Sequence, residues 1–246
     1  GTIRESSNEK KTAHLTQMAN DKPGKLELFD ADLMLEGSFA AGIDGCQTVF
    51  HTASPFFIRV KDPQKDLIDP AEKGTRNVLM QACKTPSVKR VVVTSSCAAI
   101  YGDNADLANT PGGAFTEAAW NESSSPTHQP YSYSKTVAEK EAWRIARAQS
   151  QWDLVTINPS FVLGPGLNPQ GTNESNVFVK QLGDGTMKVG LPKYGIGVVD
   201  VRDVADAHMR AAFRPEASGR HIVSGHNSEF LELASVLREQ FPKGFS

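Results

Sequence analysis

The sequence predicts an α/β fold in which a doubly wound parallel sheet carries helices on both faces. Short apolar runs alternate with longer stretches of helical period, which is the pattern that a parallel sheet wrapped by helices produces. The composition is that of a folded protein, since 39% of the 246 residues are hydrophobic and 22% are charged. These values exclude disordered and collagen-like chains.

Four apolar runs are the predicted strands, and each ends in small or polar residues. In chain order they are Leu26–Phe29, Thr48–His51, Arg90–Thr94 and Leu154–Ile157. Polar residues after a buried strand place a loop at the carboxyl edge of the sheet. Open α/β sheets bind their ligands at this edge.

Stretches with the helical spacing of apolar residues lie between and after these runs. They are 8–19, 38–43, 70–83, 131–148, 201–213 and 230–241. Asn8 and Ser38 begin the first two, and we expect their side chains to cap those helices. The segment 102–130 is rich in Asn, Gly, Ser, Thr and Pro. It is predicted to be a long surface loop, either a functional lid or a solvated insertion.

The charge balance and the cysteines narrow the possible partners. With 26 basic and 28 acidic residues the formal net charge is −2, so the composition indicates no nucleic-acid partner. No stretch approaches the ~18 uninterrupted apolar residues of a membrane helix, and no membrane partner is expected. Three isolated cysteines favour a reducing, cytoplasmic location. No cluster of His, Cys, Asp and Glu has metal-ligand spacing, so no metal is predicted.

Tyr131 and Lys135 are the strongest candidates for chemistry. Residues four apart share a face of a helix, so we expect the phenol and the ammonium at one site. A phenol has an unperturbed pKa of ~10, and a neighbouring ammonium favours the phenolate and lowers that pKa. Tyr133 also precedes Lys135, but its spacing points the two side chains apart. The same spacing also occurs on solvated helix faces, and the pair by itself does not exclude that interpretation.

Ser95 and Ser96 end the most hydrophobic predicted strand, upstream of Tyr131. A hydroxyl at the carboxyl edge of a sheet can hydrogen-bond a substrate carbonyl, although a polar residue can also simply end a strand. Taken together with the tyrosine and the lysine, the serines favour a catalytic site.

These motifs together resemble the extended short-chain dehydrogenase/reductase superfamily. The resemblance rests on Thr94-Ser-Ser96 after Val91-Val-Val93, on Tyr131 with Lys135, and on Asn158-Pro-Ser-Phe-Val-Leu-Gly-Pro165. Further segments are similar to the dihydroflavonol reductase and cinnamoyl-CoA reductase branch, which includes microbial aldehyde and ketone reductases. They are His51-Thr-Ala-Ser-Pro55, Gly74-Thr-Arg-Asn-Val-Leu79, and Lys11 downstream of Arg4.

The resemblance implies a Rossmann-type fold with a smaller C-terminal substrate lobe. Residues 1–157 would form the NAD(P)-binding domain and 158–246 mostly the substrate lobe, with 188–217 returning to the main domain. The Gly-rich turn that holds a pyrophosphate in such folds has no counterpart in the sequence. We therefore expect a strand, a Gly-rich turn and a helix before Gly1, over about 30–40 residues, and weak cofactor binding without them.

The resemblance also implies an NADPH-dependent reductase that transfers hydride to an aldehyde or ketone. Tyr131 would be the proton donor, Lys135 would hold the nicotinamide ribose, and Ser96, rather than Ser95, matches the catalytic serine. The partner would be a small-molecule carbonyl substrate, and the chain would act as a monomer or a homodimer. Apolar walls for the substrate, or alternatively core residues, would be Phe56, Phe57 and Phe161.

Several positions match the family's cofactor contacts. Arg4 and Lys11 match the pair that holds the 2′-phosphate of NADPH through charge-assisted hydrogen bonds. If both are ordinary surface cations, NADH is the alternative and Glu5 becomes the ribose partner. The remaining matches are Asp32 and Leu33 beside the adenine, Thr52 and Ala53 along the pyrophosphate and nicotinamide, and Pro159 and Val162 against the nicotinamide.

Two other functions stay open on the sequence. A sugar-nucleotide epimerase of the same superfamily fits Tyr101-Gly102, whereas a dehydratase would need an acidic pair where Cys97-Ala98 follows Ser96. A regulator that binds the cofactor without turnover would keep the fold. Such relatives usually lose the Tyr and Lys pair, and both residues are present.

Overall fold

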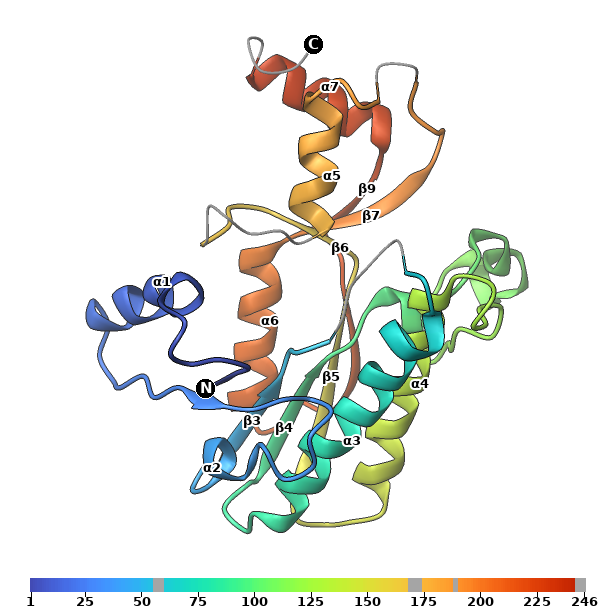
Figure 1. Cartoon of the computed structure of the whole chain (residues 1–246). Coiled ribbons are helices and arrows are strands. Elements are labelled where there is room, and N and C mark those ends of the chain that lie inside the picture. The colour runs from blue at the N-terminus through green and yellow to red at the C-terminus, as the bar shows by residue number, and fades with distance from the viewer. Residues whose placement is uncertain (55–59, 168–173, 188–189, 242–246) are drawn as a thin grey trace.

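The computed structural model describes residues 1–54, 60–167, 174–187 and 190–241, and it confirms the predicted α/β fold (Figure 1). The main sheet has four parallel strands in the order β3-β4-β5-β8. Their bounds are Thr48–His51, Arg90–Thr94, Asp153–Pro159 and Gly219–Val223. The first two strands have the predicted bounds and the third is longer by one residue at its start and two at its end. β8 lies outside the predicted strands.

Helices cover both faces of this sheet, as the three consecutive valines of β4 require. Val91 and Val93 belong to one hydrophobic core with residues of α3 (Asp69–Lys84) and α4 (Pro130–Arg147). Val92 packs on the other face with residues of α6 (Val201–Phe213). Successive side chains of a strand point to opposite faces, so an uninterrupted apolar run fits a strand buried on both sides. These three helices match the prediction to within one residue at each end.

The first part of the chain forms a separate pair of short parallel strands. β1 (Thr2–Ile3) pairs with β2 (Phe29–Asp30), and α1 (Glu9–Asn20) connects them. The predicted strand at 26–29 is wrong except for Phe29. Leu26 is 38% exposed, and β1 offers only two residues as pairing partners.

Neither predicted N-cap makes the expected hydrogen bond. Asn8 occupies the N-cap position of α1, but its side-chain amide donates to the Glu5 carboxylate at 3.0 Å. Ser38 Oγ donates to the Asp32 carbonyl at 2.8 Å and accepts from the Asp32 N–H at 3.1 Å. It closes a turn ahead of α2 (Ala40–Ile43), which begins two residues later. Serine and asparagine form loop hydrogen bonds as readily as caps.

A second, smaller sheet lies beyond the carboxyl edge of the main sheet (Figure 1). β6 (Phe161–Leu163) pairs in parallel with β7 (Gly195–Asp200), which pairs antiparallel with β9 (His226–Glu229). α5 (Glu174–Gly183) and α7 (Phe230–Gln240) pack against each other and against this sheet. Of these elements, only α7 matches a predicted segment. The proposed division of the chain into two domains stays a prediction.

The chain passes between the two sheets three times, from β5 to β6, from β7 to α6 and from β8 to β9. Gly197 of β7 lies where these passages are crowded. A Cβ atom there would lie 2.9 Å from Ser224 Oγ and 3.1 Å from Ser160 Cβ. The absence of a side chain at this position therefore allows the three segments to approach each other.

Short helical turns fill the longer connections. A π-helical turn at Gln64–Ile68 leads directly into α3, and a 3₁₀ turn at Cys97–Ala99 follows β4. The predicted surface loop contains two more 3₁₀ turns, Asn104–Asn109 and Pro111–Gly113.

Candidate active site

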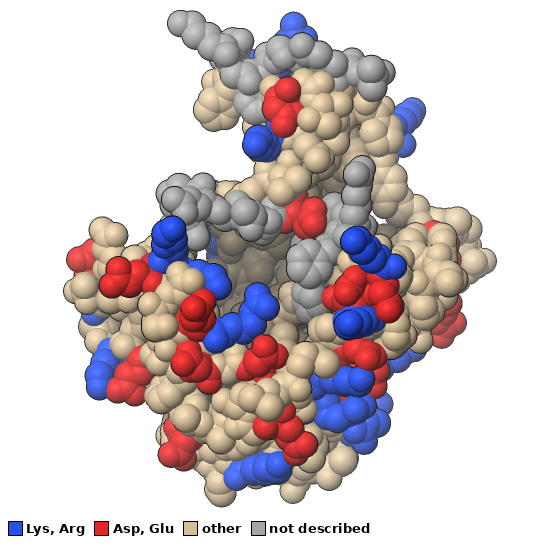
Figure 2. Space-filling model, in the orientation of Figure 1, with Lys and Arg blue, Asp and Glu red and all other residues tan. Residues whose placement is uncertain are grey.

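The residues predicted to be catalytic lie at the carboxyl edge of the main sheet. Ser96 is the second residue after β4, while Tyr131 and Lys135 lie in the first turns of α4, which packs against β5 and against the turn after β4. Pro130 is the first residue of that helix, where its missing N–H leaves no hydrogen bond unmade. On this face of the molecule a hollow separates the main sheet from the smaller one, with basic and acidic side chains interspersed around it (Figure 2).

Ser96 and Tyr131 are hydrogen-bonded to each other through their side chains. Ser96 Oγ also accepts a hydrogen bond from the Ala98 N–H at 3.1 Å, which fixes it at the start of the 3₁₀ turn. Burial raises the pKa of Tyr131 to about 12, and the hydrogen bond with Ser96 acts in the opposite direction. At neutral pH the phenol is therefore protonated.

Lys135 is a buried ammonium, with 7% of its surface exposed. Its Nζ donates to the Thr94 carbonyl at 3.4 Å. Burial lowers the pKa of Lys135 to about 8, while the negative charge of Glu139 raises it. Contrary to the expectation from the spacing of Tyr131 and Lys135, the pKa of Tyr131 is raised, because burial of the phenol is the largest influence on it.

A small cavity connects Lys135 to the end of β3. Its lining includes Ala53, Ser54, Thr75, Ser95 and Lys135. Within the described part of the chain, the buried Ser54 Oγ has no hydrogen-bond partner, and Lys135 Nζ uses one of its three donors on Thr94. Spare polar groups at this edge of a Rossmann-type sheet fit the hydroxyl and phosphate groups of a dinucleotide.

His51, the first residue of the motif 51–55, is a buried residue of this region that was not among the predicted site residues. It ends β3, and its Nε2 lies 3.2 Å from Thr75 Oγ1. Burial, assisted by the charge of Lys135, lowers the pKa of His51 to about 4. The ring is therefore neutral beside the ammonium at physiological pH.

The predicted adenine contacts lie in the loop after β2. The Asp32 carboxylate accepts the Met34 N–H at 2.7 Å and so holds a turn. Leu33 packs against α3, where a Cβ on Gly74 would lie only 3.0 Å from it, and its carbonyl accepts from Asn77 at 2.7 Å. Leu33 thus has a packing role in addition to any cofactor contact.

The predicted phosphate contacts lie at the surface. Arg4 and Lys11 are exposed, and Lys11 Nζ lies 3.5 Å from the Glu5 carboxylate. The loop between them is held by the Ser6 N–H, which donates to Asp30 at 2.6 Å. Both cations therefore come from one short segment after β1.

The predicted nicotinamide and substrate contacts lie where β5 continues into β6. Pro159 is buried at the end of β5, and Val162 pairs with Val199 of β7. Phe161 packs edge-on against Phe178 with a centroid distance of 5.4 Å, which ties it to the aromatic core of the smaller lobe. The other two predicted substrate contacts, Phe56 and Phe57, lie outside the described residues. Thr52 and Ala53 follow β3 and are exposed.

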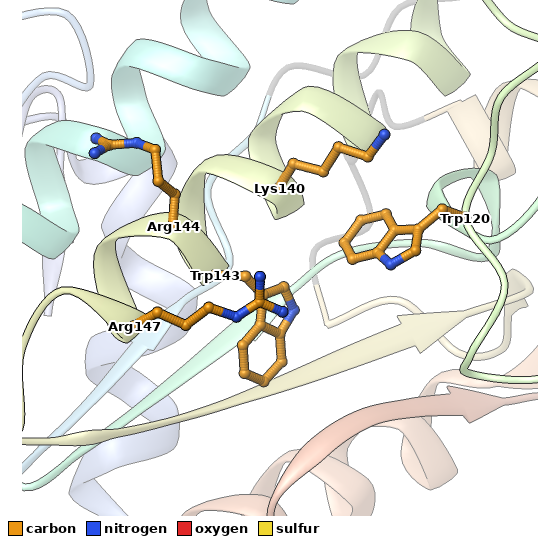
Figure 3. Close-up of a pocket in the computed structure, with 5 residues that line it drawn as sticks. All are labelled: Trp120, Lys140, Trp143, Arg144 and Arg147. Carbon is orange, nitrogen blue, oxygen red and sulfur yellow. The ribbon is translucent and has the colours of Figure 1, made fainter.

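A larger hollow, of about 400 Å³, lies on the outer side of α4 (Figure 3). It is lined by Trp120, Lys140, Trp143, Arg144 and Arg147. None of the predicted catalytic residues lines it. Two of the residues that line it contact buried charged side chains. Trp143 Nε1 donates to Glu139 at 3.2 Å, and the ring of Trp120 stacks against the Arg220 guanidinium.

The described residues offer neither a cluster of potential metal ligands nor a helix that could cross a membrane. They contain no group of three or more His, Cys, Asp or Glu side chains placed to hold a metal ion. They also contain no helix with the length and apolar character needed to cross a bilayer.

Comparison with known proteins gives matches over nearly the whole chain. The NAD dependent epimerase/dehydratase family profile matches residues 2–225. The cinnamoyl-CoA reductase CAD2 of Medicago truncatula is 41% identical over 243 residues, which covers 98% of this chain and 72% of that protein. An anthocyanidin reductase of Arabidopsis thaliana is 36% identical over 253 residues, covering 98% and 73%.

A solved structure agrees with these matches. The yeast methylglyoxal/isovaleraldehyde reductase Gre2, complexed with NADPH, superimposes with a TM-score of 0.85 at 32% identity, over 98% of this chain and 75% of that one. These three relatives are reductases by name. The chain therefore belongs to the NAD dependent epimerase/dehydratase family, within the extended short-chain dehydrogenases/reductases similar to dihydroflavonol and cinnamoyl-CoA reductases, and is an NAD(P)-dependent oxidoreductase.

Proposed function

We propose that this protein reduces an aldehyde or ketone with hydride from NADPH, and that Tyr131 donates the proton to the carbonyl oxygen. The observation that carries the proposal is the hydrogen bond between Ser96 and Tyr131 beside the buried Lys135. Two chain segments, the turn after β4 and the first turns of α4, bring these side chains to the edge of the sheet where ligands of such folds bind.

Each of the three side chains has a distinct part in the proposed reaction. Tyr131 keeps its proton at neutral pH because burial raises the pKa of its phenol to about 12. The hydroxyls of Ser96 and Tyr131 together offer donors to the carbonyl oxygen, where negative charge develops in the transition state. The Lys135 ammonium adds positive charge to the same low-dielectric region and offers its spare N–H groups to ribose hydroxyls. NADPH, when bound, supplies the hydride.

The choice of NADPH is supported by Arg4 and Lys11. Both are exposed cations of one segment after β1, which suits a 2′-phosphate. The yeast reductase Gre2, 32% identical to this chain, was solved with NADPH. NADH remains the alternative cofactor, with Glu5 as the ribose partner. We propose Asp32, Leu33, Thr52, Ala53, Pro159 and Val162 as the other cofactor contacts.

The proposed substrate is a small carbonyl compound that enters the hollow between the two sheets. Phe161 is the first residue of β6, in the smaller sheet. The free cysteines Cys46, Cys83 and Cys97 are consistent with a proposed cytoplasmic location. We further propose a monomer or homodimer as the acting unit.

An absorbance assay of NADPH oxidation with a panel of aldehydes and ketones tests the proposal. Turnover with NADPH that requires a carbonyl compound is expected. If no carbonyl is reduced but a nucleotide sugar is converted without net oxidation of cofactor, the protein is an epimerase instead. Cofactor binding without turnover of either substrate class identifies a regulator.

A further inference from the structure

A buried carboxylate, Glu139, lies on the same face of α4 as the proposed catalytic residues. It follows Lys135 by one helical turn and Tyr131 by two. Only 1% of its surface is exposed. A buried charge is strongly unfavourable unless it is paired and hydrogen-bonded, so its partners indicate what it does.

Glu139 accepts hydrogen bonds from four residues that belong to three strands of the main sheet or directly follow one of them. Ser95 at the end of β4 donates at 2.5 Å, while Thr156 and Asn158 of β5 donate at 3.1 Å and 2.8 Å. Arg220 of β8 donates from Nε at 2.6 Å and from Nη2 at 3.3 Å. The carboxylate therefore holds three neighbouring strands against the helix that carries Tyr131.

Asn158 extends this network to the proposed catalytic serine. Its side-chain amide donates to Glu139 and also to the carbonyl oxygen of Ser96, at 3.1 Å. Ser95, the next residue back, is held by Glu139 directly. The backbone that presents Ser96 Oγ to Tyr131 is thus fixed on both sides through one carboxylate.

Arg220 completes the network on its outer side. The ion pair is buried, with 8% of the Arg220 side chain and none of the Glu139 side chain exposed. The guanidinium also donates to the carbonyls of Ala99 and Glu117, at 3.2 Å and 2.8 Å. It lies 3.7 Å from the ring centroid of Trp120, which Figure 3 shows beside Trp143 on the outer side of α4.

The same carboxylate is the negative charge that faces Lys135 within the described residues. The other titratable or charged groups around the ammonium come from several elements: Tyr131 of α4, His51 of β3, His208 of α6 through Thr94, and Arg220 of β8. His51 is neutral, because burial lowers its pKa to about 4. The Arg220 guanidinium, which is ion-paired with Glu139, partly offsets the negative charge of that carboxylate.

We propose that Glu139, in its ion pair with Arg220, is a positioning residue for the reaction: it aligns Ser96 with Tyr131 and keeps Lys135 in its ammonium form. This inference rests on the proposed roles of those three side chains. Buried ion pairs contribute little net stability, so the specific arrangement that the pair imposes is its functional contribution.

The test is Glu139→Gln, which keeps the size of the side chain and removes its charge. Lys135 then loses its counter-charge, and we expect its pKa to fall by about one pH unit. Since burial already lowers the pKa of Lys135 to about 8, the charged fraction at pH 8 falls about fivefold and that at pH 6 hardly changes. The basic limb of the kcat/KM profile should move to lower pH accordingly.

Glu141→Gln is the matched control. Glu141 lies on the same helix, is 7% exposed, and pairs with Arg76 and Arg144, both at 2.6 Å. Glu141→Gln likewise removes a buried carboxylate from its arginine partners, whose side chains are 42% and 64% exposed, but it should leave the pH profile in place. A basic limb displaced equally in both variants would overturn the inference.

A direct titration of Lys135 separates this inference from the proposed function. The Cε signal of Lys135 in ¹³C-lysine-labelled full chain, assigned with Lys135→Met, reports its pKa without any turnover. An unchanged titration in Glu139→Gln overturns the charge role whether or not the wild type reduces carbonyls. A wild type without carbonyl reduction overturns the proposed function, and the titration still decides the coupling.

Glu139→Asp covers the case in which Glu139→Gln does not fold. It keeps the charge and shortens the reach to Ser95, Asn158 and Arg220. We expect the Lys135 titration to stay near that of the wild type, whereas kcat falls at least tenfold because Ser96 is no longer aligned. A kcat equal to that of the wild type, or a Lys135 pKa about one pH unit lower, would contradict the proposal.

Discussion

Tyr131→Phe removes the proposed proton donor and almost nothing else. The Ser96 hydroxyl loses one hydrogen-bond partner but keeps the Ala98 N–H at 3.1 Å, so we expect a stability change of about 1 kcal/mol or less. Loss of a positioned general acid lowers turnover by ~10²–10⁴, which corresponds to about 3–5 kcal/mol of transition-state stabilisation. The predicted effect on the reaction therefore exceeds the effect on the fold severalfold.

The assay is carbonyl-dependent NADPH oxidation in the full-length protein, together with urea unfolding and cofactor titration. Cofactor affinity should stay within about threefold of the wild type, since Lys135 remains. Tyr133→Phe is the matched control, because Tyr133 lies on the same helix two residues nearer to Lys135. Turnover of Tyr131→Phe within ~10-fold of the wild type, or an equal loss in Tyr133→Phe, would refute the assignment.

Three further perturbations test other parts of the structure. Arg4→Asp should reverse a preference for NADPH over NADH in kcat/KM, while Lys10→Asp should leave that preference intact. A wild type that prefers NADH would refute the assignment of Arg4 and Lys11 to the 2′-phosphate and would favour Glu5 as the ribose partner. Lys135→Met should abolish turnover yet raise the free energy of unfolding at pH 7 by about 3 kcal/mol, because burial lowers the pKa of Lys135 from 10.5 to about 8. The difference in free energy of unfolding between Lys135→Met and the wild type should be largest below pH 8 and should decrease as the pH rises towards 10.5. A difference that increases with pH, measured by urea unfolding, would contradict this prediction. Arg90→Ala should lower stability by about 2 kcal/mol without changing kcat, because Arg90 Nη1 donates to the carbonyl of Ala211 in α6 and to that of Ala217 in the loop after it, at 2.7 Å and 3.1 Å. Arg210→Ala, which removes an exposed ion pair with Asp206, should cost under about 0.5 kcal/mol, and equal losses in the two variants would show that Arg90 has no special role.

The predictable parts of the fold are the elements whose buried residues form a regular apolar pattern within a short stretch of sequence. Val91, Val92 and Val93 are buried on alternating faces, and so the run itself predicts a central strand. The helix that contains Tyr131 and Lys135 likewise has a regular apolar spacing. β8 has no such pattern, because Arg220 and His221 stand in its middle. Its charge is accommodated by Glu139, 81 residues away in the sequence.

The candidate site divides in the same way. Ser96, Tyr131 and Lys135 were recognised because their residue types and spacings form a motif. Glu139 has the helical spacing of a core position but carries a charge, and only the arrangement of Thr156, Asn158 and Arg220 around it explains why that charge is tolerated. Leu33 shows the converse, since a position selected for a cofactor also packs tightly on Gly74.

The three passages of the chain between the two sheets have a consequence for recombination between related reductases. No single cut separates the smaller lobe, because the chain enters it before β6, returns to the main body after β7 and enters the lobe again before β9. A donor lobe has to be exchanged as two segments, about 160–200 and from 224 onward, and the graft keeps α6 and β8 of the recipient. Gly197, Ser160 and Ser224 meet at the junctions. A chimera that carries a larger residue at any of them would be expected to fold its two halves and fail to join them.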